Sequence, residues 1–312
     1  MFSHVSRPVR RAASVAAVLA AAAVLAMTTA KVAPTSPTAP GTAVHAARPD
    51  RAPLLQQAAG TGTGMFPLLV RAKDGHLYDY EPSGTGGFEP RFDLGGGYGD
   101  ATALAQANIS RNLTGTDLYA VIDGTLYYTA ERGADTKVLG TGWGAYDLLV
   151  SADSLAGTAQ PDLLARDKDG ALWLYQGKAD GTLAAKVRAG ASGWDAMSDI
   201  TGRGDYTGDG KADILARSST GTLYLYPGTG NATADAVFGT RVTVAAVGGT
   251  AWNTYGDVVS VGDNDGDGKP DLFALDKLGT LWLYKGTGKA SAPFAARTKI
   301  GLMPWTTYNL LF

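Results

Sequence analysis

The chain repeats one pattern five times, with equivalent positions 45 to 58 residues apart. This period limits the fold to an array of similar units. Three copies are clear and read PDLLARDKDGALWLYQG, ADILARSSTGTLYLYPG and PDLFALDKLGTLWLYKG, beginning at Pro161, Ala212 and Pro270. Weaker copies begin at Phe66 and Thr116.

A second element, which begins with an aromatic residue, precedes four of the copies. It starts at Tyr98, Trp143, Trp194 and Trp252, and a further example runs from Trp305 to Phe312. The first unit therefore lacks this element at its start, and the last eight residues supply it. Such an arrangement predicts a closed ring in which the final strand pairs with the first and removes an exposed sheet edge.

Each unit contains about four short segments that are rich in β-forming residues and separated by glycine, which favours strands over helices. In LWLY, alternation places Leu172 and Leu174 on one face, and Trp173 and Tyr175 on the other. Because both faces are apolar, a sheet packed between two others fits better than a sheet with one wet face. We therefore interpret Trp173 and Trp282 as core residues. The sequence predicts an all-β fold: a five-bladed β-propeller over residues 63–312, closed by pairing of the C-terminal strand with the first N-terminal strand.

The first 62 residues have a different composition. Residues 1–30 combine a basic start, an apolar stretch and small residues, which is typical of a secretory signal peptide, and a membrane anchor is the weaker alternative. Residues 31–62, rich in Pro, Ala and Thr, are interpreted as a disordered linker. We therefore expect a secreted protein without membrane insertion.

Composition excludes several classes of function. The chain has no cysteine, which rules out disulfides, thiol catalysis and Cys-ligated zinc. Without the first 30 residues the net charge is near −5, which argues against a nucleic-acid partner. Only His76 lies beyond the leader and linker, so histidine triads and multi-histidine metal sites are also disfavoured.

Two loops carry acidic residues at alternate positions. In GDNDGDGKPDLF, the candidate metal ligands are Asp263, Asp265, Asp267, the Lys269 carbonyl and Asp271. In GDYTGDGKADIL, they are Asp205, Thr207, Asp209, the Lys211 carbonyl and Asp213. Hard oxygen ligands around a glycine turn favour Ca²⁺, so two calcium sites are predicted. The alternative is an Asp/Gly turn that only caps a hairpin.

The pattern D-x-D-x-D-G-x-x-D followed by a hydrophobic strand, inside repeated units, resembles FG-GAP and VCBS-type repeats. The resemblance covers nearly all of residues 63–312 but is specific in two units only, because the third unit has Ala156 and Thr158 where carboxylates belong. It implies that the calcium ions are structural. The layout also resembles secreted five-bladed lectin-like propellers, including the lectin subunits of the umbrella toxin particles of actinobacteria. That likeness implies binding of cell-surface carbohydrate as the targeting subunit of an antibacterial complex.

A candidate ligand-binding rim lies at the ends of the strands opposite the calcium loops. First strands begin with Trp143, Trp194, Trp252 and Trp305, and second strands end with Arg71, Arg166 and Arg217. Aromatic rings stack on sugars, and arginine donates to hydroxyls or carboxylates. The alternative is that the tryptophans pack as wedges between blades.

Three functions are compatible with these features. We favour a non-catalytic, calcium-stabilised carbohydrate-binding propeller over a protein-docking subunit of a secreted complex. A polysaccharide-active enzyme is a third hypothesis, disfavoured because the clustered carboxylates belong to the metal loops and no nucleophile–base pair is visible.

Overall fold

A computed structural model describes residues 63–312, apart from 111–116, 131–134 and 302–304. The predicted signal peptide and linker lie outside the described residues. Within them the chain is all-β, with 20 strands and four 3-10 turns. None of the described helical segments is long and apolar enough to cross a membrane.

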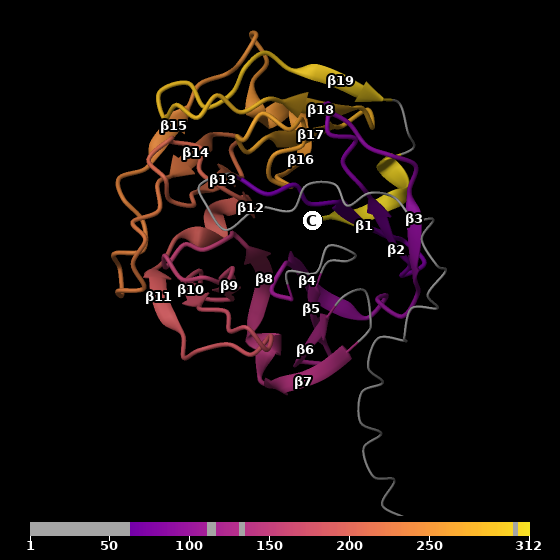
Figure 1. Ribbon diagram of the computed structural model, residues 1–312, viewed down its shortest axis with the longest axis vertical. Helices are drawn as coiled ribbons and strands as arrows, with labels where there is room; N and C mark the ends of the chain where they lie inside the picture. Colours follow the sequence, from indigo (N-terminus) through magenta and orange to yellow (C-terminus); the bar gives the residue numbers. More distant parts are fainter. Residues whose placement is uncertain (1–62, 111–116, 131–134, 302–304) are drawn as a thin grey trace, which may run out of the picture. The chain divides into compact units, whose positions relative to one another are not determined.

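The strands form five four-stranded antiparallel sheets, the blades, arranged around a common axis (Figure 1). Blade 1 contains β20 (Tyr308–Leu311), β1 (Leu68–Ala72), β2 (Leu77–Tyr80) and β3 (Phe92–Gly95). Blade 2 contains β4 (Ala101–Ala107), β5 (Asp117–Ile122), β6 (Thr125–Ala130) and β7 (Asp135–Thr141). Blade 3 contains β8 (Tyr146–Ser151), β9 (Leu163–Asp167), β10 (Leu172–Tyr175) and β11 (Val187–Gly190). Blade 4 contains β12 (Met197–Thr201), β13 (Ile214–Ser218), β14 (Leu223–Tyr226) and β15 (Val242–Val244). Blade 5 contains β16 (Tyr255–Val259), β17 (Leu272–Asp276), β18 (Leu281–Tyr284) and β19 (Thr298–Gly301).

Ring closure is confirmed in the predicted place. Strand β20 pairs antiparallel with β1, with Val70 opposite Leu311. The backbone N–H of Leu69 donates to the Phe312 oxygen at 3.0 Å, and the Phe312 N–H donates to the Leu69 oxygen at 2.9 Å. The first blade is thus assembled from both ends of the described chain, and its inner edge is paired rather than open.

The hydrophobic core is divided among the junctions between blades. Each of five clusters of buried side chains combines residues from two neighbouring blades. Between blades 3 and 4, for example, Leu172 and Leu174 pack with Ile200 and Ile214. Burying one such side chain contributes about 1.5–3 kcal/mol. Stability therefore depends on contacts between units, as expected for a repeat fold.

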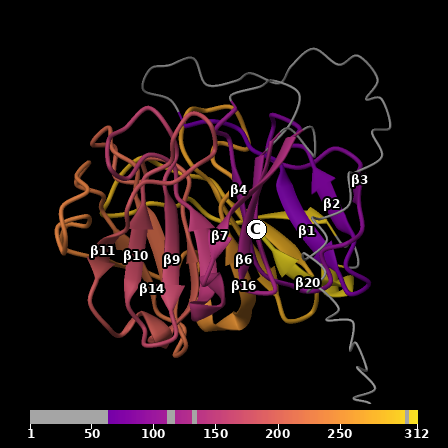
Figure 2. The same ribbon diagram turned by 90° about the horizontal axis from the view of Figure 1, so that it is seen from below.

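A 3-10 turn precedes the innermost strand in four blades: η1 (Trp143–Ala145), η2 (Trp194–Ala196), η3 (Trp252–Thr254) and η4 (Trp305–Thr307). Each turn of this kind approaches the β-turn between the second and third strands of the preceding blade. Gly221 in one such β-turn has φ +87°, and a Cβ there would lie 2.2 Å from the Cβ of Asn253 in η3. Glycine is required at this position both by its backbone conformation and by the close approach. In the side view, loops gather at two opposite ends of the strands (Figure 2).

Candidate functional site

The loop between β16 and β17 brings three predicted ligands together. Carboxylate oxygens of Asp263, Asp265 and Asp267 lie within 4.8 Å of one another. Asp263 accepts hydrogen bonds from the backbone N–H groups of Gly266 and Gly268, both at 2.8 Å, which winds the loop around its carboxylate. Lysine ammonium groups approach the other two carboxylates: Lys285 lies 2.6 Å from Asp265, and Lys269 lies 2.9 Å from Asp267.

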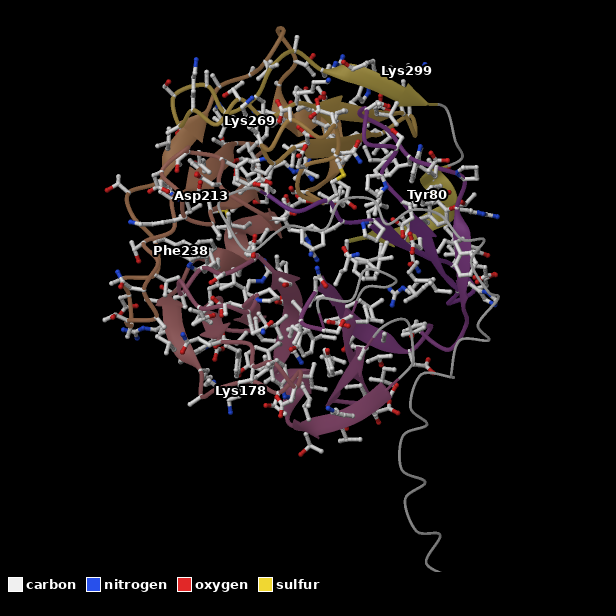
Figure 3. All side chains as sticks on the ribbon, in the orientation of Figure 1. Tyr80, Lys178, Asp213, Phe238, Lys269 and Lys299 are labelled. Carbon is white, nitrogen blue, oxygen red and sulfur yellow. The ribbon has the colours of Figure 1, made fainter. Side chains whose placement is uncertain are left out.

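The loop between β12 and β13 has the same form. Carboxylate oxygens of Asp205, Asp209 and Asp213 lie within 4.8 Å of one another. The Thr207 hydroxyl donates to Asp205 at 3.1 Å, so this predicted ligand also belongs to the cluster. The backbone N–H groups of Lys211 and Lys269 donate to Asp209 and Asp267, each at 3.0 Å. Coordination by the carbonyls of these two lysines stays a prediction. Figure 3 labels one residue from each loop, Asp213 and Lys269.

The last aspartate of each loop is fully buried and joins the loop to the rest of its blade. Asp213 accepts from the Gly228 N–H at 2.9 Å, and Asp271 accepts from the Gly286 N–H at 2.8 Å. Burial raises the pKa of Asp213 to about 6 and that of Asp271 to about 7. Neighbouring carboxylates contribute to these raised pKa values, and the backbone hydrogen bonds oppose the increase.

These donor sets fit a hard divalent cation. Each loop gathers several carboxylates, at least one of them buried, and burying carboxylates together is unfavourable unless a positive charge accompanies them. Oxygen ligands on a tight glycine turn suit Ca²⁺. Asp271 is absent from the group that converges within 4.8 Å, so in blade 5 the structure assembles three of the four predicted carboxylates in one cluster. The identity of the ion stays a prediction.

The predicted tryptophan rim lies largely inside the blades. Trp194, Trp252 and Trp305 are buried, and Trp143 is half-buried. Each indole packs against the tyrosine that ends the third strand of its own blade, with ring centroids 4.7–4.9 Å apart; these tyrosines are Tyr175, Tyr226, Tyr284 and Tyr80. This geometry supports the packing alternative for these residues.

The predicted rim arginines connect one blade to the next. Arg217 donates to the main-chain oxygens of Trp252 and Tyr255 in the following blade, and to the Asp199 carboxylate at 2.7 Å. Arg166 donates in the same way to Trp194 and Met197, and Arg71 to Tyr98 and Ala101. Each guanidinium therefore reaches the turn of the next blade.

The interpretation of Trp173 and Trp282 as core residues is confirmed only in part, because both pack against hydrophobic core clusters but lie at the edge of these clusters. Both side chains are half-buried, and each indole N–H donates to an aspartate, Asp167 at 2.7 Å and Asp276 at 2.9 Å. A basic group lies over each ring at 3.9 Å from the centroid: the Lys186 ammonium over Trp173 and the Arg297 guanidinium over Trp282.

Two further blades carry the same kind of pair, with tyrosine in place of tryptophan. The Arg91 guanidinium lies 4.3 Å from the centroid of Tyr78, and the Arg241 guanidinium lies 4.2 Å from that of Tyr224. Both tyrosines are half-buried. We call these four pairs the edge aromatics. The aromatic residue of each pair is the second residue of the third strand of its blade. Aligning the repeats therefore identifies the aromatic residues, but not their basic partners.

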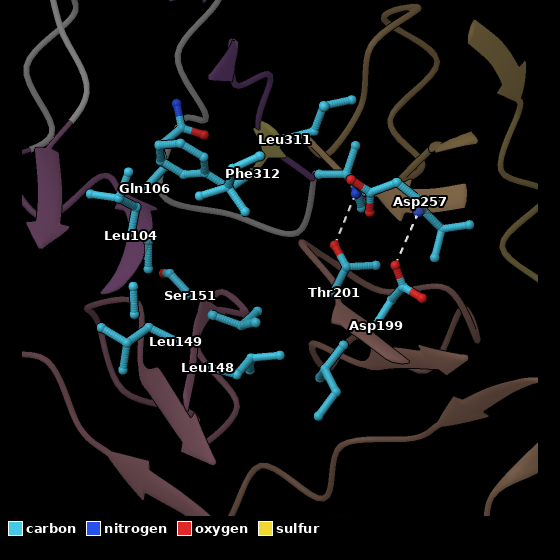
Figure 4. Close-up of a pocket in the computed structure, with 18 of the residues that line it drawn as sticks. Leu104, Gln106, Leu148, Leu149, Ser151, Asp199, Thr201, Asp257, Leu311 and Phe312 are labelled. Carbon is cyan, nitrogen blue, oxygen red and sulfur yellow. Dashed lines mark hydrogen bonds between the residues drawn. The ribbon is translucent and has the colours of Figure 1, made fainter. Parts of the chain in front are cut away.

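Sequence reasoning also missed a pair of carboxyls. Asp199 and Asp257 line a cavity on the axis of the ring, on the innermost strands of blades 4 and 5, and both are labelled in Figure 4. Asp199 accepts from Arg217, whereas Asp257 is hydrogen-bonded to Asp199. Burial and the neighbouring Asp199 charge hold the pKa of Asp257 well above its usual range. Asp257 therefore keeps its proton to a higher pH than an ordinary aspartate does.

Comparison with protein-family models matches residues 205–274 to the FG-GAP-like repeat. This segment runs from the first metal loop through the second and into β17. A search of curated protein sequences found no match. The match agrees with the repeat resemblance drawn from the sequence, in the two units where that resemblance is specific.

Several solved structures are similar in fold. The BP39L lectin of Burkholderia pseudomallei is 15% identical, with TM-score 0.43, and the match covers 78% of this chain and 69% of the lectin. Prp20p of Saccharomyces cerevisiae is 12% identical, with TM-score 0.37, over 75% of this chain and 61% of that one. A putative 6-phosphogluconolactonase of Bacteroides fragilis is 14% identical, with TM-score 0.39, over 77% and 83%. At these TM-scores the likenesses carry no argument about function.

Proposed function

We propose that this protein is an exported, non-catalytic, calcium-stabilised propeller that binds carbohydrate. One observation carries the proposal: four blades present a half-buried aromatic ring beside a basic side chain. Aromatic faces pack on the C–H surface of a sugar, while ammonium and guanidinium groups donate to its hydroxyls or carboxylates.

The pair in blade 3 illustrates the chemistry. The indole of Trp173 is fixed by its hydrogen bond to Asp167, so the ring is a rigid platform. Lys186 is exposed and also donates to the Tyr146 hydroxyl at 3.1 Å. A cation–π contact at an exposed site is worth only about 0.5–1 kcal/mol. A sugar therefore displaces the ammonium from the ring at small cost, and Lys186 then donates to sugar oxygens.

Repetition of the pair suits a polymeric target. The edge aromatics recur in blades 1, 3, 4 and 5, so one molecule offers up to four similar sites. Several weak sites on one rigid ring gain affinity through effective concentration when the ligand is a repeating surface glycan. The proposed target is thus a cell-surface polysaccharide.

A polysaccharide-active enzyme is the second candidate, and the Asp199–Asp257 pair is the observation that favours it. Glycosidases use two carboxyls roughly 5–9 Å apart, with the scissile bond or a water between them. Here Asp199 is held by Arg217 at 2.7 Å and interacts directly with Asp257, so both carboxyls are engaged with protein groups. We therefore propose a binding role for the protein and a structural role for this pair.

A more detailed part of the proposal concerns which surface carries the glycan and which partner proteins bind the propeller. The resemblance to toxin-particle lectins leads us to propose that the propeller directs an extracellular antibacterial complex to a surface. Affinity purification of the native protein from culture fluid tests this role. Recovery of other subunits supports it, and recovery of the monomer alone contradicts it.

Binding to a glycan array and to purified bacterial cell walls, in excess calcium, tests the carbohydrate proposal. We expect the double variant Trp173→Ala, Trp282→Ala to lose most of the binding. Leu278→Ala is the matched control, because Leu278 is a large apolar side chain that is 89% exposed and lies outside the pairs. Absence of binding by the folded wild-type protein contradicts the proposal.

A further inference from the structure

The cavity on the ring axis has a volume of about 220 Å³ and is lined by the innermost strand of every blade. The Asp199–Asp257 pair lies toward the strand ends that follow the 3-10 turns. At the opposite strand ends, next to the loops between first and second strands, the lining includes Gln106, Ser151 and Arg203. Gln106 and Ser151 are labelled together in Figure 4.

Among the residues that the structure describes, two polar side chains at this second end have no hydrogen-bond partner. The Gln106 side chain is 1% exposed, and neither its carboxamide nitrogen nor its oxygen makes a hydrogen bond. Ser151 is 4% exposed, and its hydroxyl is also without a hydrogen bond. Leaving a buried donor or acceptor unpaired costs about 1–3 kcal/mol. Two unpaired polar side chains that line the same cavity therefore indicate a site for a polar ligand.

Arg203 adds a buried positive charge to the same end. Its side chain is buried, its guanidinium donates to the main-chain oxygen of Gln106, and it lies 4.5 Å from the centroid of the Phe66 ring. Loss of hydration lowers the pKa of Arg203 to about 10, and this effect exceeds the opposing influence of Asp153 and Tyr206. A buried cation without a carboxylate partner in contact is strongly unfavourable.

We propose that this end of the axial cavity binds a small organic carboxylate. The guanidinium of Arg203 offers a planar pair of donors that matches a carboxylate. The Gln106 carboxamide and the Ser151 hydroxyl supply further donors beside it. The acidic pair at the other end would repel an anion, so the carboxylate group is directed toward Arg203.

This site is separate from the edge aromatics and does not depend on the proposed carbohydrate function. It lies on the axis, whereas the edge aromatics lie on the third strand of each blade, two strands away from the axis. Loss of either activity therefore leaves the other intact.

Isothermal titration calorimetry with sodium glucuronate and sodium acetate, in excess calcium, tests the proposal, with glucose and sulfate as comparison ligands. We expect both carboxylates to bind and to raise the melting temperature, because a ligand bound only by the folded state stabilises it. Glucose should give no response. No response to either carboxylate overturns the proposal, and binding of sulfate with no binding of carboxylates overturns it as well.

A same-sized variant locates the site. Gln106→Glu places a carboxylate in the same end of the cavity as Arg203. We therefore expect a higher melting temperature without ligand, and glucuronate binding weakened at least tenfold, roughly the effect of losing one hydrogen bond to a charged group. Ser198→Ala, in the same cavity but at the acidic end, is the matched control and should bind as the wild type does. The variant lacking Trp173 and Trp282 should also retain carboxylate binding. Unchanged glucuronate binding by folded Gln106→Glu overturns the assignment.

Discussion

Replacing Arg217 with methionine distinguishes a structural role from a ligand-binding role for the predicted rim. Arg217 is 5% exposed and donates to Trp252, Tyr255 and Gly256 of the next blade, as well as to Asp199. Methionine has a similar length but no donor, so the change leaves a largely buried carboxylate and several carbonyl groups without their partner.

Breaking a buried pair by removing one partner costs about 3–5 kcal/mol. For a domain of 150–250 residues, each kcal/mol lowers the melting temperature by about 2–4 °C, so we expect a decrease of roughly 6–20 °C. Thermal unfolding followed by circular dichroism, in excess calcium, measures it. The matched control is Arg188→Met, which removes an ion pair with Asp235 whose side chains are 46% and 47% exposed. Solvent screens this pair, so its loss should change the melting temperature little.

The reasoning is refuted if Arg217→Met melts no lower than Arg188→Met. It is also refuted if Arg217→Met keeps its stability but loses carbohydrate binding, because that result would place the guanidinium in a ligand site. Retained glycan binding by the folded but destabilised variant agrees with the inter-blade role.

Three further predictions concern ions, protons and ring closure. Chelation by EDTA should lower the melting temperature, and Asp263→Asn should reduce this effect; an unchanged melt in excess chelator contradicts the calcium sites. Asp257 has a raised pKa in the folded state, so the free energy of unfolding of the wild type should fall, relative to that of Asp257→Asn, as pH rises from about 4 toward that pKa. The expected decrease is up to about 1.4 kcal/mol per pH unit, measured by urea unfolding. Parallel pH profiles of the two proteins would show that Asp257 is ionised. Deleting residues 305–312 should unfold or oligomerise the protein by exposing the edge of β1, as measured by size-exclusion chromatography, and a stable monomer contradicts closure.

The fold could be predicted from the sequence because the same pattern of short strands and glycine turns occurs five times. Alternation in LWLY and the aromatic element from Trp305 to Phe312 were sufficient to indicate blades and their closure. Both depend on local spacing, which is visible without coordinates. The metal loops were visible for the same reason, since their ligands lie within nine residues of each other.

The partners of the arginines could not be predicted, because they belong to the next blade. Arg217 and the Tyr255 carbonyl are 38 residues apart and meet only through the packing of blade 4 on blade 5. The exposure of Trp173 was missed because alternation shows which residues share a face and does not show how far neighbouring sheets cover that face. Both errors concern contacts between units.

The residues that line the axial cavity could be predicted from the sequence only in part. Asp199 and Asp257 occupy the same position of neighbouring repeats, so a full alignment of the first strands would have paired them. Gln106 in β4 and Ser151 in β8 also occupy equivalent positions near the ends of their strands, but the side chain at this position differs in chemistry from one repeat to the next. Only the geometry of the ring shows that these unlike side chains line one cavity.

Fluorine NMR of the protein labelled with 5-fluorotryptophan tests the carbohydrate account most directly, because the chain has six tryptophans in two structural classes. Titration with a glycan selected on the array should shift the resonances of Trp173 and Trp282 and leave those of Trp143, Trp194, Trp252 and Trp305 in place. Shifts confined to these four turn tryptophans would contradict the account and return the binding site to the rim.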